Sequence, residues 1–293
     1  MRPLDVLTVV FVMLIWGVNF TVAKTGMAEI SPILMIFLRF TLVAALLVPF
    51  VPRPTPPQMR RIAVIGLCFG GLHFPLMFVG ISGVDASYAA IASQLSVPFS
   101  ALLAAAFYGD RLGWRRTLGL LIAFAGIAVI AGRPTGSSSL FYLGLLIAGA
   151  AFWSVANMQI KELGPIDGFQ LSAWIAVFSV PLLLAASLVF EDGQIEQLAS
   201  AGWIGWGAVV YQGVAVAILS YSLWYPLVRR YDVNVVMPFN LLNPVFGVLC
   251  AVLILGDPLT WSLLVGAALV IGGVGIITVR RPRLVDARAS NNT

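Results

Sequence analysis

Two amide side chains stand four residues before a proline inside long apolar stretches: Gln94 before Pro98, and Asn240 before Pro244. A proline within a helix cannot donate to the carbonyl four residues earlier, so each proline frees the carbonyl of the amide residue itself. In lipid, protein, water or a ligand must satisfy that carbonyl. With Asn243 beside Pro244, the pattern predicts kinks that line a path and amides that bind a zwitterion. Structural kinks whose amides bond between helices are an equal alternative.

Two tryptophans lie near the middle of apolar stretches, and each precedes a lysine by the same spacing, Trp16–Lys24 and Trp153–Lys161. Tryptophan is usually found at the membrane interfaces. A tryptophan at mid-depth needs a partner for its indole N–H, so we expect both to face the bundle interior. Lining of a cavity and plain helix packing are equally compatible with this placement.

Two basic side chains also lie within apolar stretches. His73 stands two residues before Pro75, where it would contact a cavity, relay protons or serve as a packing histidine. Arg39 should point inward or extend to the interface, because an arginine on the lipid face is costly. It would serve a substrate carboxylate or bond backbone carbonyls at a helix junction. We favour the structural role, since its helix is expected at the periphery.

Tyr211 and Gln212 are also deep enough in their helix to reach a cavity. The candidate cavity residues are Trp16, Asn19, His73, Met77, Gln94, Trp153, Asn157, Tyr211, Gln212, Asn240 and Asn243, with Pro98 and Pro244 as candidate kinks or gates. The acidic residues all fall near helix ends, in loops or in the tail, which disfavours a cation pump or strongly cationic substrates. One histidine and two cysteines within apolar runs indicate no metal site, no cofactor and no catalytic group, so an enzyme is not expected.

The composition shows which elements must position these residues. The chain is 60% hydrophobic and only 10% charged, whereas soluble domains are roughly 45–50% apolar and about 25% charged. Repeated apolar runs of about 20 residues predict membrane-spanning helices. Strand-like alternation is absent, so we expect ten helices, over about 4–23, 31–51, 62–82, 86–107, 115–133, 140–160, 168–189, 201–225, 233–255 and 261–280.

An internal repeat divides this series in two. The pattern G-D-x-L-x-W-x4-G-x6-G begins at Gly109 and again at Gly256. Each half holds an odd number of helices, so the two copies must run in opposite directions through the membrane. Such inverted repeats are a common basis of alternating access. The glycines of the pattern let helices approach closely, in packing or in a dimer contact.

The distribution of positive charge sets the orientation. With both termini in the cytoplasm, all of the 17 Lys and Arg residues except Lys24, Arg39 and Arg133 lie in inside segments. The positive-inside rule therefore predicts cytoplasmic termini. It also explains the net charge of +5 without a nucleic-acid partner.

The repeat elements resemble the drug/metabolite transporter superfamily, specifically its EamA-type transporters, and most of all the aromatic amino-acid exporters among them. The resemblance covers nearly the whole chain. That family usually has glutamate where Asp110 and Asp257 stand, a mild departure. The matching residues are Trp16, Gly17, Asn19, Arg39, Pro98, Gly109, Asp110, Gly119 and Gly126 in the first half, and Trp153, Pro244, Gly256, Asp257, Gly266 and Gly273 in the second.

Together these observations predict an all-α membrane protein of ten transmembrane helices, arranged as two five-helix inverted repeats around a central cavity. The repeats would span 1–134 and 135–281, and 282–293 would form a disordered cytoplasmic tail. The resemblance implies a bacterial inner-membrane exporter of neutral or aromatic amino acids, a monomer or weak homodimer in the bilayer. Export of nucleosides, sugars or cationic drugs, and a passive channel, are the alternatives.

Overall fold

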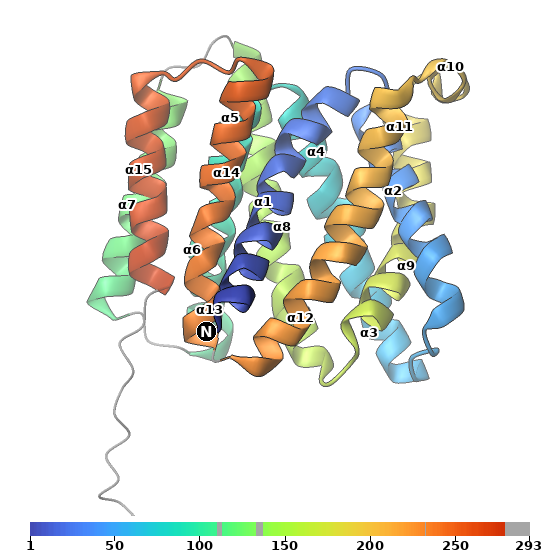
Figure 1. Cartoon of the computed structure of the whole chain (residues 1–293), viewed down its shortest axis with the longest axis horizontal. Coiled ribbons are helices and arrows are strands. Elements are labelled where there is room, and N and C mark those ends of the chain that lie inside the picture. Colours follow the sequence, from blue (N-terminus) through green and yellow to red (C-terminus); the bar gives the residue numbers. More distant parts are fainter. Residues whose placement is uncertain (110–112, 133–136, 232, 279–293) are drawn as a thin grey trace, which may run out of the picture.

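The computed structural model describes residues 1–109, 113–132, 137–231 and 233–278. These residues fold into helices, with no strand among them. Ten helices in this part of the chain are long and apolar enough to cross a membrane, as the sequence predicts. Asp110 of the first repeat motif and the predicted tail 282–293 lie outside the described residues. The helices stand side by side (Figure 1).

Several spans are interrupted by short 3₁₀ or π segments, here labelled η. In chain order the elements are α1 (Pro3–Gly26), α2 (Pro32–Leu47), η1 (Val48–Phe50), α3 (Pro56–Gly66), η2 (Leu67–His73), α4 (Phe74–Ser82), α5 (Ala86–Ala92), η3 (Ser93–Leu95), α6 (Ser96–Tyr108), α7 (Trp114–Ala131), α8 (Ser137–Leu163), α9 (Gly168–Phe190), α10 (Gln194–Ser200), α11 (Trp203–Val210), η4 (Tyr211–Leu219), α12 (Ser220–Arg230), α13 (Val233–Val236), η5 (Met237–Leu241), α14 (Leu242–Cys250), η6 (Ala251–Leu255) and α15 (Trp261–Thr278).

Local sequence accounts for where the helices begin and end. Pro56 opens α3, where the missing N–H costs nothing, and Thr55 and Gln58 form a capping box there. Gly109 and Gly256, which open the two repeat motifs, end the helices before them with φ values of 65° and 72°. Glycine is the residue that adopts this left-handed conformation without steric cost. The two motifs therefore share a backbone turn as well as a sequence pattern.

The helix leaves α geometry just before each of the two motif prolines. The segment η3 precedes Pro98 by a few residues, and η5 stands in the same relation to Pro244. Because each proline removes a backbone donor, the turn before it lacks its usual hydrogen bond and tightens. These two breaks place Gln94 and Asn240 on irregular backbone in the interior of the bundle.

The helices group into two bundles that each draw on both halves of the chain. The contacts place α1 against α11, α12 and α14, and α8 against α3, α4 and α6. The spans of the two repeats correspond in sequence order. In this order α1 is equivalent to α8, α14 to α6, and the α11–α12 span to the α3–α4 span. The two bundles are therefore composed of equivalent spans. Both also contain a π segment at the same place, η4 in one and η2 in the other.

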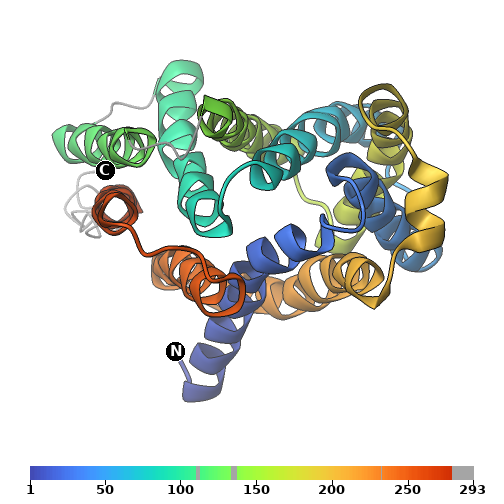
Figure 2. The ribbon, with the colours of Figure 1, turned by 90° about the horizontal axis from the view of Figure 1, so that it is seen from above.

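The helices that follow the two repeat motifs, α7 and α15, pack against each other at one edge of the molecule (Figure 2). Figure 1 shows that α7 ends at the level where α15 begins, so the two helices are antiparallel. A Cβ added to Gly119 would lie 2.7 Å from the carbonyl oxygen of Gly273, and one added to Gly126 would lie 2.7 Å from that of Gly266. The glycine stripes are thus used for packing within the chain.

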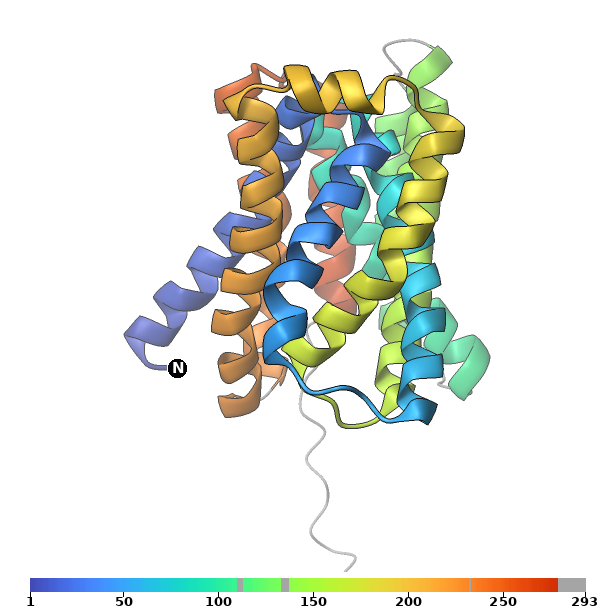
Figure 3. The ribbon, with the colours of Figure 1, turned by 90° about the vertical axis from the view of Figure 1, so that its right-hand side faces the viewer.

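One end of the molecule is fixed by two carboxylates. The short helix α10 crosses this end between α9 and α11 (Figure 3). Glu191 accepts the backbone N–H groups of Ile33 at 2.7 Å and Leu34 at 2.9 Å, at the start of α2. Glu29 accepts backbone N–H groups at the start of α11, including that of Gly205 at 2.7 Å. Each carboxylate satisfies donors that a helix start leaves open.

Candidate functional site

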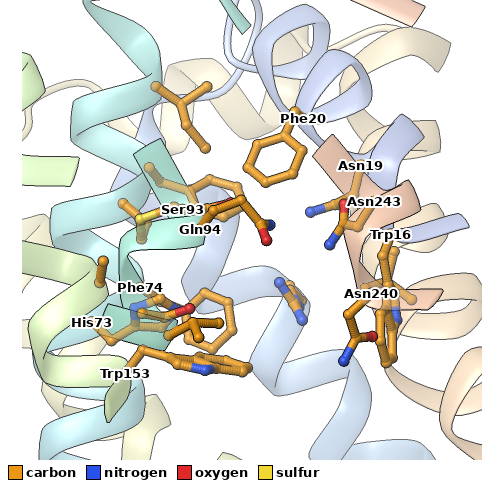
Figure 4. A pocket seen from close by; sticks show the side chains of 18 of the residues that line it. Trp16, Asn19, Phe20, His73, Phe74, Ser93, Gln94, Trp153, Asn240 and Asn243 are labelled. Carbon is orange, nitrogen blue, oxygen red and sulfur yellow. The ribbon is translucent and has the colours of Figure 1, made fainter. Parts of the chain in front are cut away.

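A cavity of about 310 Å³ lies between the two bundles. Its volume is at the lower end of the range of small-molecule sites, roughly 300–1,000 Å³. It is lined by Trp16, Asn19, Phe20, Arg39, His73, Phe74, Met77, Phe78, Ile81, Ser93, Gln94, Ser96, Val97, Ala150, Trp153, Val216, Tyr221, Asn240 and Asn243. Figure 4 shows Trp16, Asn19, Asn240 and Asn243 on one side and His73, Phe74, Gln94 and Trp153 on the other. Each side therefore belongs to one of the two bundles.

The bundle formed around α8 contributes an aromatic wall. The ring centroid of His73 lies 4.9 Å from that of Trp153 and 4.7 Å from that of Phe74. His73 Nδ1 lies 2.8 Å from the carbonyl oxygen of Gly149 on α8. A carbonyl only accepts, so Nδ1 carries the proton in this bond and Nε2 is an acceptor in the neutral ring. The sequence left His73 as a cavity contact, a relay or a packing residue; the structure makes it a buried residue bonded to α8 that also lines the cavity.

The bundle formed around α1 contributes an amide wall. Asn19 and Asn243 point across the cavity toward Gln94 (Figure 4). Their side-chain oxygens are buried and have no hydrogen-bond partner among the described residues. Gln94, only 8% exposed, likewise has no side-chain hydrogen bond to any residue in the described ranges. A buried polar group without a partner costs free energy, so these amides are suited to a polar ligand or water.

Trp16 lines the cavity and is also held by its neighbours. Its indole N–H donates to Ser220 Oγ at 2.7 Å. Its ring lies 5.7 Å from that of Tyr221 and 5.4 Å from that of Trp224. The partner that a mid-depth tryptophan requires is therefore Ser220 of α12. Trp153, its counterpart in the repeat, lies on the opposite wall (Figure 4).

Arg39 points inward, which is one of the two placements that the sequence analysis expected. We favoured a structural role at a helix junction, yet its buried side chain lines the cavity. The guanidinium carbon lies 4.6 Å from the ring centroid of Phe74 and 5.7 Å from that of Phe40. It forms no hydrogen bond or ion pair with any residue that the structure describes. The sequence indicated that the side chain avoids the lipid, but it did not show that the cavity is where it points.

Three other candidates do not line the cavity. Asn157 is exposed and donates to the carbonyl of Trp153, one turn earlier in α8, at 2.9 Å. Tyr211 donates to the carbonyl of Ile15 at 2.8 Å. Gln212 is fully buried, and its Nε2 lies 3.3 Å from Met35 Sδ. The last two stand at the start of η4, and both make their contacts away from the cavity.

The two prolines act on the cavity through the backbone. Neither Pro98 nor Pro244 is part of the lining. Both are buried, and both follow the 3₁₀ segments that carry Gln94 and Asn240. The cavity also holds lining residues that sequence reasoning omitted, chiefly Phe20, Phe74, Ser93 and Tyr221. Their types are common in packed helices, so nothing in the sequence distinguishes them.

At the end of the molecule remote from the N-terminus, contacts join the two halves above the cavity. Asp257 Oδ2 accepts the backbone N–H of Ser87 at 2.9 Å, at the start of α5. The hydroxyls of Tyr88 and Thr260 lie 3.1 Å apart. Asp257 belongs to the second repeat motif and α5 to the first half of the chain. The repeat motif therefore serves as a contact between halves.

Asp85, in the loop before α5, lies in the electrostatic field of this contact. Burial raises the pKa of the Asp85 carboxyl above its ordinary value, and the negative charge of Asp257 raises it further. The positive charge of Lys24 opposes both effects. Lys24 itself donates to three carbonyl oxygens at the end of α4, those of Ile81, Ser82 and Val84, at 3.0, 2.9 and 2.7 Å.

The comparisons with known proteins agree with this architecture. The chain is 30% identical to a "Probable amino-acid metabolite efflux pump" of Salmonella typhimurium, over 90% of this chain and 91% of that protein. It is 28% identical to the protein of the same description from Escherichia coli, over 93% and 94% of the two chains. A crystal structure of a protein 21% identical superposes with a TM-score of 0.63, covering 95% of this chain and 98% of the other.

The model of the EamA-like transporter family matches the chain twice, over residues 4–132 and 140–279. One match covers each half of the chain, and together the two matches cover nearly all of the ten helices. They point to a transporter of small molecules in a membrane rather than to an enzyme. The chain belongs to the EamA-like transporter family.

Proposed function

We propose that this protein exports neutral or aromatic amino acids across the inner membrane, by alternating access of two inverted repeats. The observation that carries the proposal is the cavity between the bundles, with an aromatic wall facing an amide wall. No aspartate or glutamate occurs in the lining as described. Such a site suits a neutral zwitterion with an apolar side chain and provides no counter-charge for a cation.

The packing of α7 against α15 supports alternating access. Gly119 and Gly266 hold the same place in the two repeats, as do Gly126 and Gly273. In the structure Gly119 meets Gly273 and Gly126 meets Gly266, so the partners are crossed. Crossed contacts are what a two-fold axis between antiparallel copies produces. Two bundles of equivalent spans could then exchange conformations and open the cavity to the other side.

The names of the relatives support the direction and the substrate class. The relatives from Salmonella typhimurium and Escherichia coli are both described as a "Probable amino-acid metabolite efflux pump". The positive charges also predict which end of the molecule faces the cytoplasm. The start of α3 and the end of α8 lie on the same side as the N-terminus (Figure 3). The sequence carries Arg60 and Arg61 near that start and Lys161 near that end, so the positive-inside rule assigns this side to the cytoplasm.

A flux screen tests the proposal. Liposomes that contain the purified protein are loaded with each of the twenty amino acids in turn. Efflux of the amino acid is then followed with and without a pH gradient. We expect saturable efflux of one or more neutral amino acids. Absence of saturable efflux for all of them removes the proposal. Efflux of nucleosides, sugars or cationic drugs instead supports the wider alternative, and single-channel currents support a passive channel.

The residue list is tested with a matched pair of substitutions. Asn19→Ala removes an amide from the cavity wall, whereas Asn157→Ala removes one from the exposed surface of α8. We expect the first to reduce flux by roughly 10-fold, the effect of losing one or two hydrogen bonds to a charged group, and the second to leave it unchanged. Alanine at Trp16, His73, Gln94, Trp153 or Asn240 extends the test. Unchanged flux in all of these variants would refute the proposed site.

A further inference from the structure

Among the lining residues that the structure describes, Arg39 alone carries a fixed charge. It is 7% exposed, comes from α2 and reaches the lining from outside the two bundles that form the walls. Its guanidinium presents five N–H donors and cannot be deprotonated in a protein. Among the residues that the structure describes, none accepts a hydrogen bond from it and none forms an ion pair with it.

A desolvated cation without a counter-ion is unfavourable unless something else compensates for it. The ring of Phe74, 4.6 Å from the guanidinium carbon, interacts with one face of the group. A stacked ring leaves the edge of the guanidinium free, and the N–H donors are on that edge. The edge has the geometry that binds a carboxylate through two parallel hydrogen bonds.

The surroundings of Arg39 favour an anion over any other ligand. No carboxylate is present in the described lining to neutralise it. Gln94, which is 8% exposed, and the amides of Asn19 and Asn243 add further polar groups with unmet hydrogen-bonding capacity. These are two independent observations of polar side chains that lack partners in one cavity. Because the amides are neutral and Arg39 is cationic, these groups together carry a positive charge.

We propose that Arg39 binds the carboxylate of the transported substrate, so that a free carboxylate is required and amines that lack one are rejected. The proposal rests on the function proposed above and makes its substrate class narrower. The aromatic wall is adjacent, since Phe74 contacts both Arg39 and His73. A substrate held by its carboxylate therefore places its side chain against aromatic rings. His73 lines the same cavity, and its Nε2 is an acceptor in the neutral ring, the kind of atom that an ammonium group binds.

Transport measurements with matched ligands test this assignment. Phenylalanine and leucine are compared with their amides, which keep the ammonium group and side chain but lack the carboxylate. The acid 3-phenylpropionate keeps the carboxylate but lacks the amine. In the wild-type protein, the amino acids and 3-phenylpropionate should compete for uptake into liposomes, and the amides should not. Equal competition by the amides would overturn the proposal.

Substitution of Arg39 supplies the second measurement. Arg39→Gln should lower kcat/KM for the amino acids roughly 10- to 100-fold and abolish the discrimination against the amides, while Arg39→Lys should retain part of both. Arg60→Gln, at an exposed site, is the matched control and should behave as wild type. An Arg39 that only supports the fold would lower flux of all ligands in parallel and leave the discrimination intact, which would contradict the proposal.

Binding separates this proposal from the function on which it rests. The melting temperature of the detergent-solubilised protein is measured with phenylalanine, leucine, 3-phenylpropionate and the two amides. The acids should raise it in the wild type and not in Arg39→Gln. If liposomes show no amino-acid flux but this shift occurs, the exporter proposal fails and the carboxylate site stands. If neither flux nor shift occurs, both fail.

Discussion

Gly119 of α7 lies directly against the backbone of Gly273 of α15, where a methyl group on Gly119 would come within 2.7 Å of the Gly273 carbonyl oxygen. The reciprocal approach is closer still, since a methyl group on Gly273 would lie 2.5 Å from the carbonyl oxygen of Gly119. Real Cβ atoms do not come this close to backbone. The contact between the two repeats therefore depends on the absence of side chains at both positions.

The first prediction follows from this contact. Gly273→Ala should lower the melting temperature in detergent, because α7 and α15 must separate, and overpacking of this kind costs about 1–3 kcal/mol. The neighbouring Gly272→Ala is the control, since a Cβ there meets no described atom within 4 Å. It should leave stability unchanged or raise it, since alanine favours helix by up to about 1 kcal/mol over glycine. Equal effects of the two substitutions would contradict the crossed glycine contact.

The second prediction concerns the carboxylate at the start of α2. Glu191→Ala leaves the N–H groups of Ile33 and Leu34 without their acceptor and should destabilise the protein by about 1–3 kcal/mol. Glu196→Ala, on the exposed surface of α10, is the control and should change stability by less than about 0.5 kcal/mol. Thermal unfolding followed by tryptophan fluorescence measures both. A loss of stability of the same size in both variants would argue against the cap.

The sequence predicted the spans well because each depends on local composition. The ten apolar runs, the helix ends at Gly109 and Gly256, and the mid-helix positions of Trp16 and Trp153 all follow from short-range patterns. Their positions on opposite walls also agree with the internal repeat (Figure 4). The motif prolines indicated where the helices depart from regular geometry, because the loss of a backbone donor is a local effect.

The sequence could not predict which way a side chain faces when the helix is irregular. Tyr211 and Gln212 begin the π segment η4, which changes the angular spacing of side chains, and they bond to α1 and α2 instead of facing the cavity. The helix of Arg39 was expected at the periphery, because helix order alone does not show that α2 reaches the space between the bundles. Asn157 shares a helix face with Trp153, yet it lies one turn beyond the cavity.

The third prediction concerns the contact between Asp257 and the start of α5. Asp257→Ala removes the acceptor of the Ser87 N–H, whereas Asp257→Asn keeps an oxygen that can accept it. We expect the alanine variant to open this end more often, by about 10-fold for the loss of one charge-assisted hydrogen bond. A cysteine placed at Ser93 in the cavity wall, with Cys68 and Cys250 replaced by serine, reports opening through its labelling by a membrane-impermeant maleimide added on that side. Identical labelling rates in both variants and the parent would show that the contact does not hold this end closed.

The last prediction concerns pH and Asp85. Burial and the charge of Asp257 raise the pKa of Asp85 in the folded protein, so the folded state binds a proton more tightly than the unfolded state. Its contribution to stability is therefore complete below the unfolded pKa of about 3.9 and is lost as pH rises through the raised folded value. Asp85→Asn should be more stable than wild type at pH 7, and the difference should shrink toward acid pH. Because the group is partly solvated, we expect only about 1–2 °C. Melting curves between pH 4 and pH 7 measure the effect, with the exposed Asp192→Asn as control; an advantage of Asp85→Asn that grows toward acid pH would reverse the assigned sign.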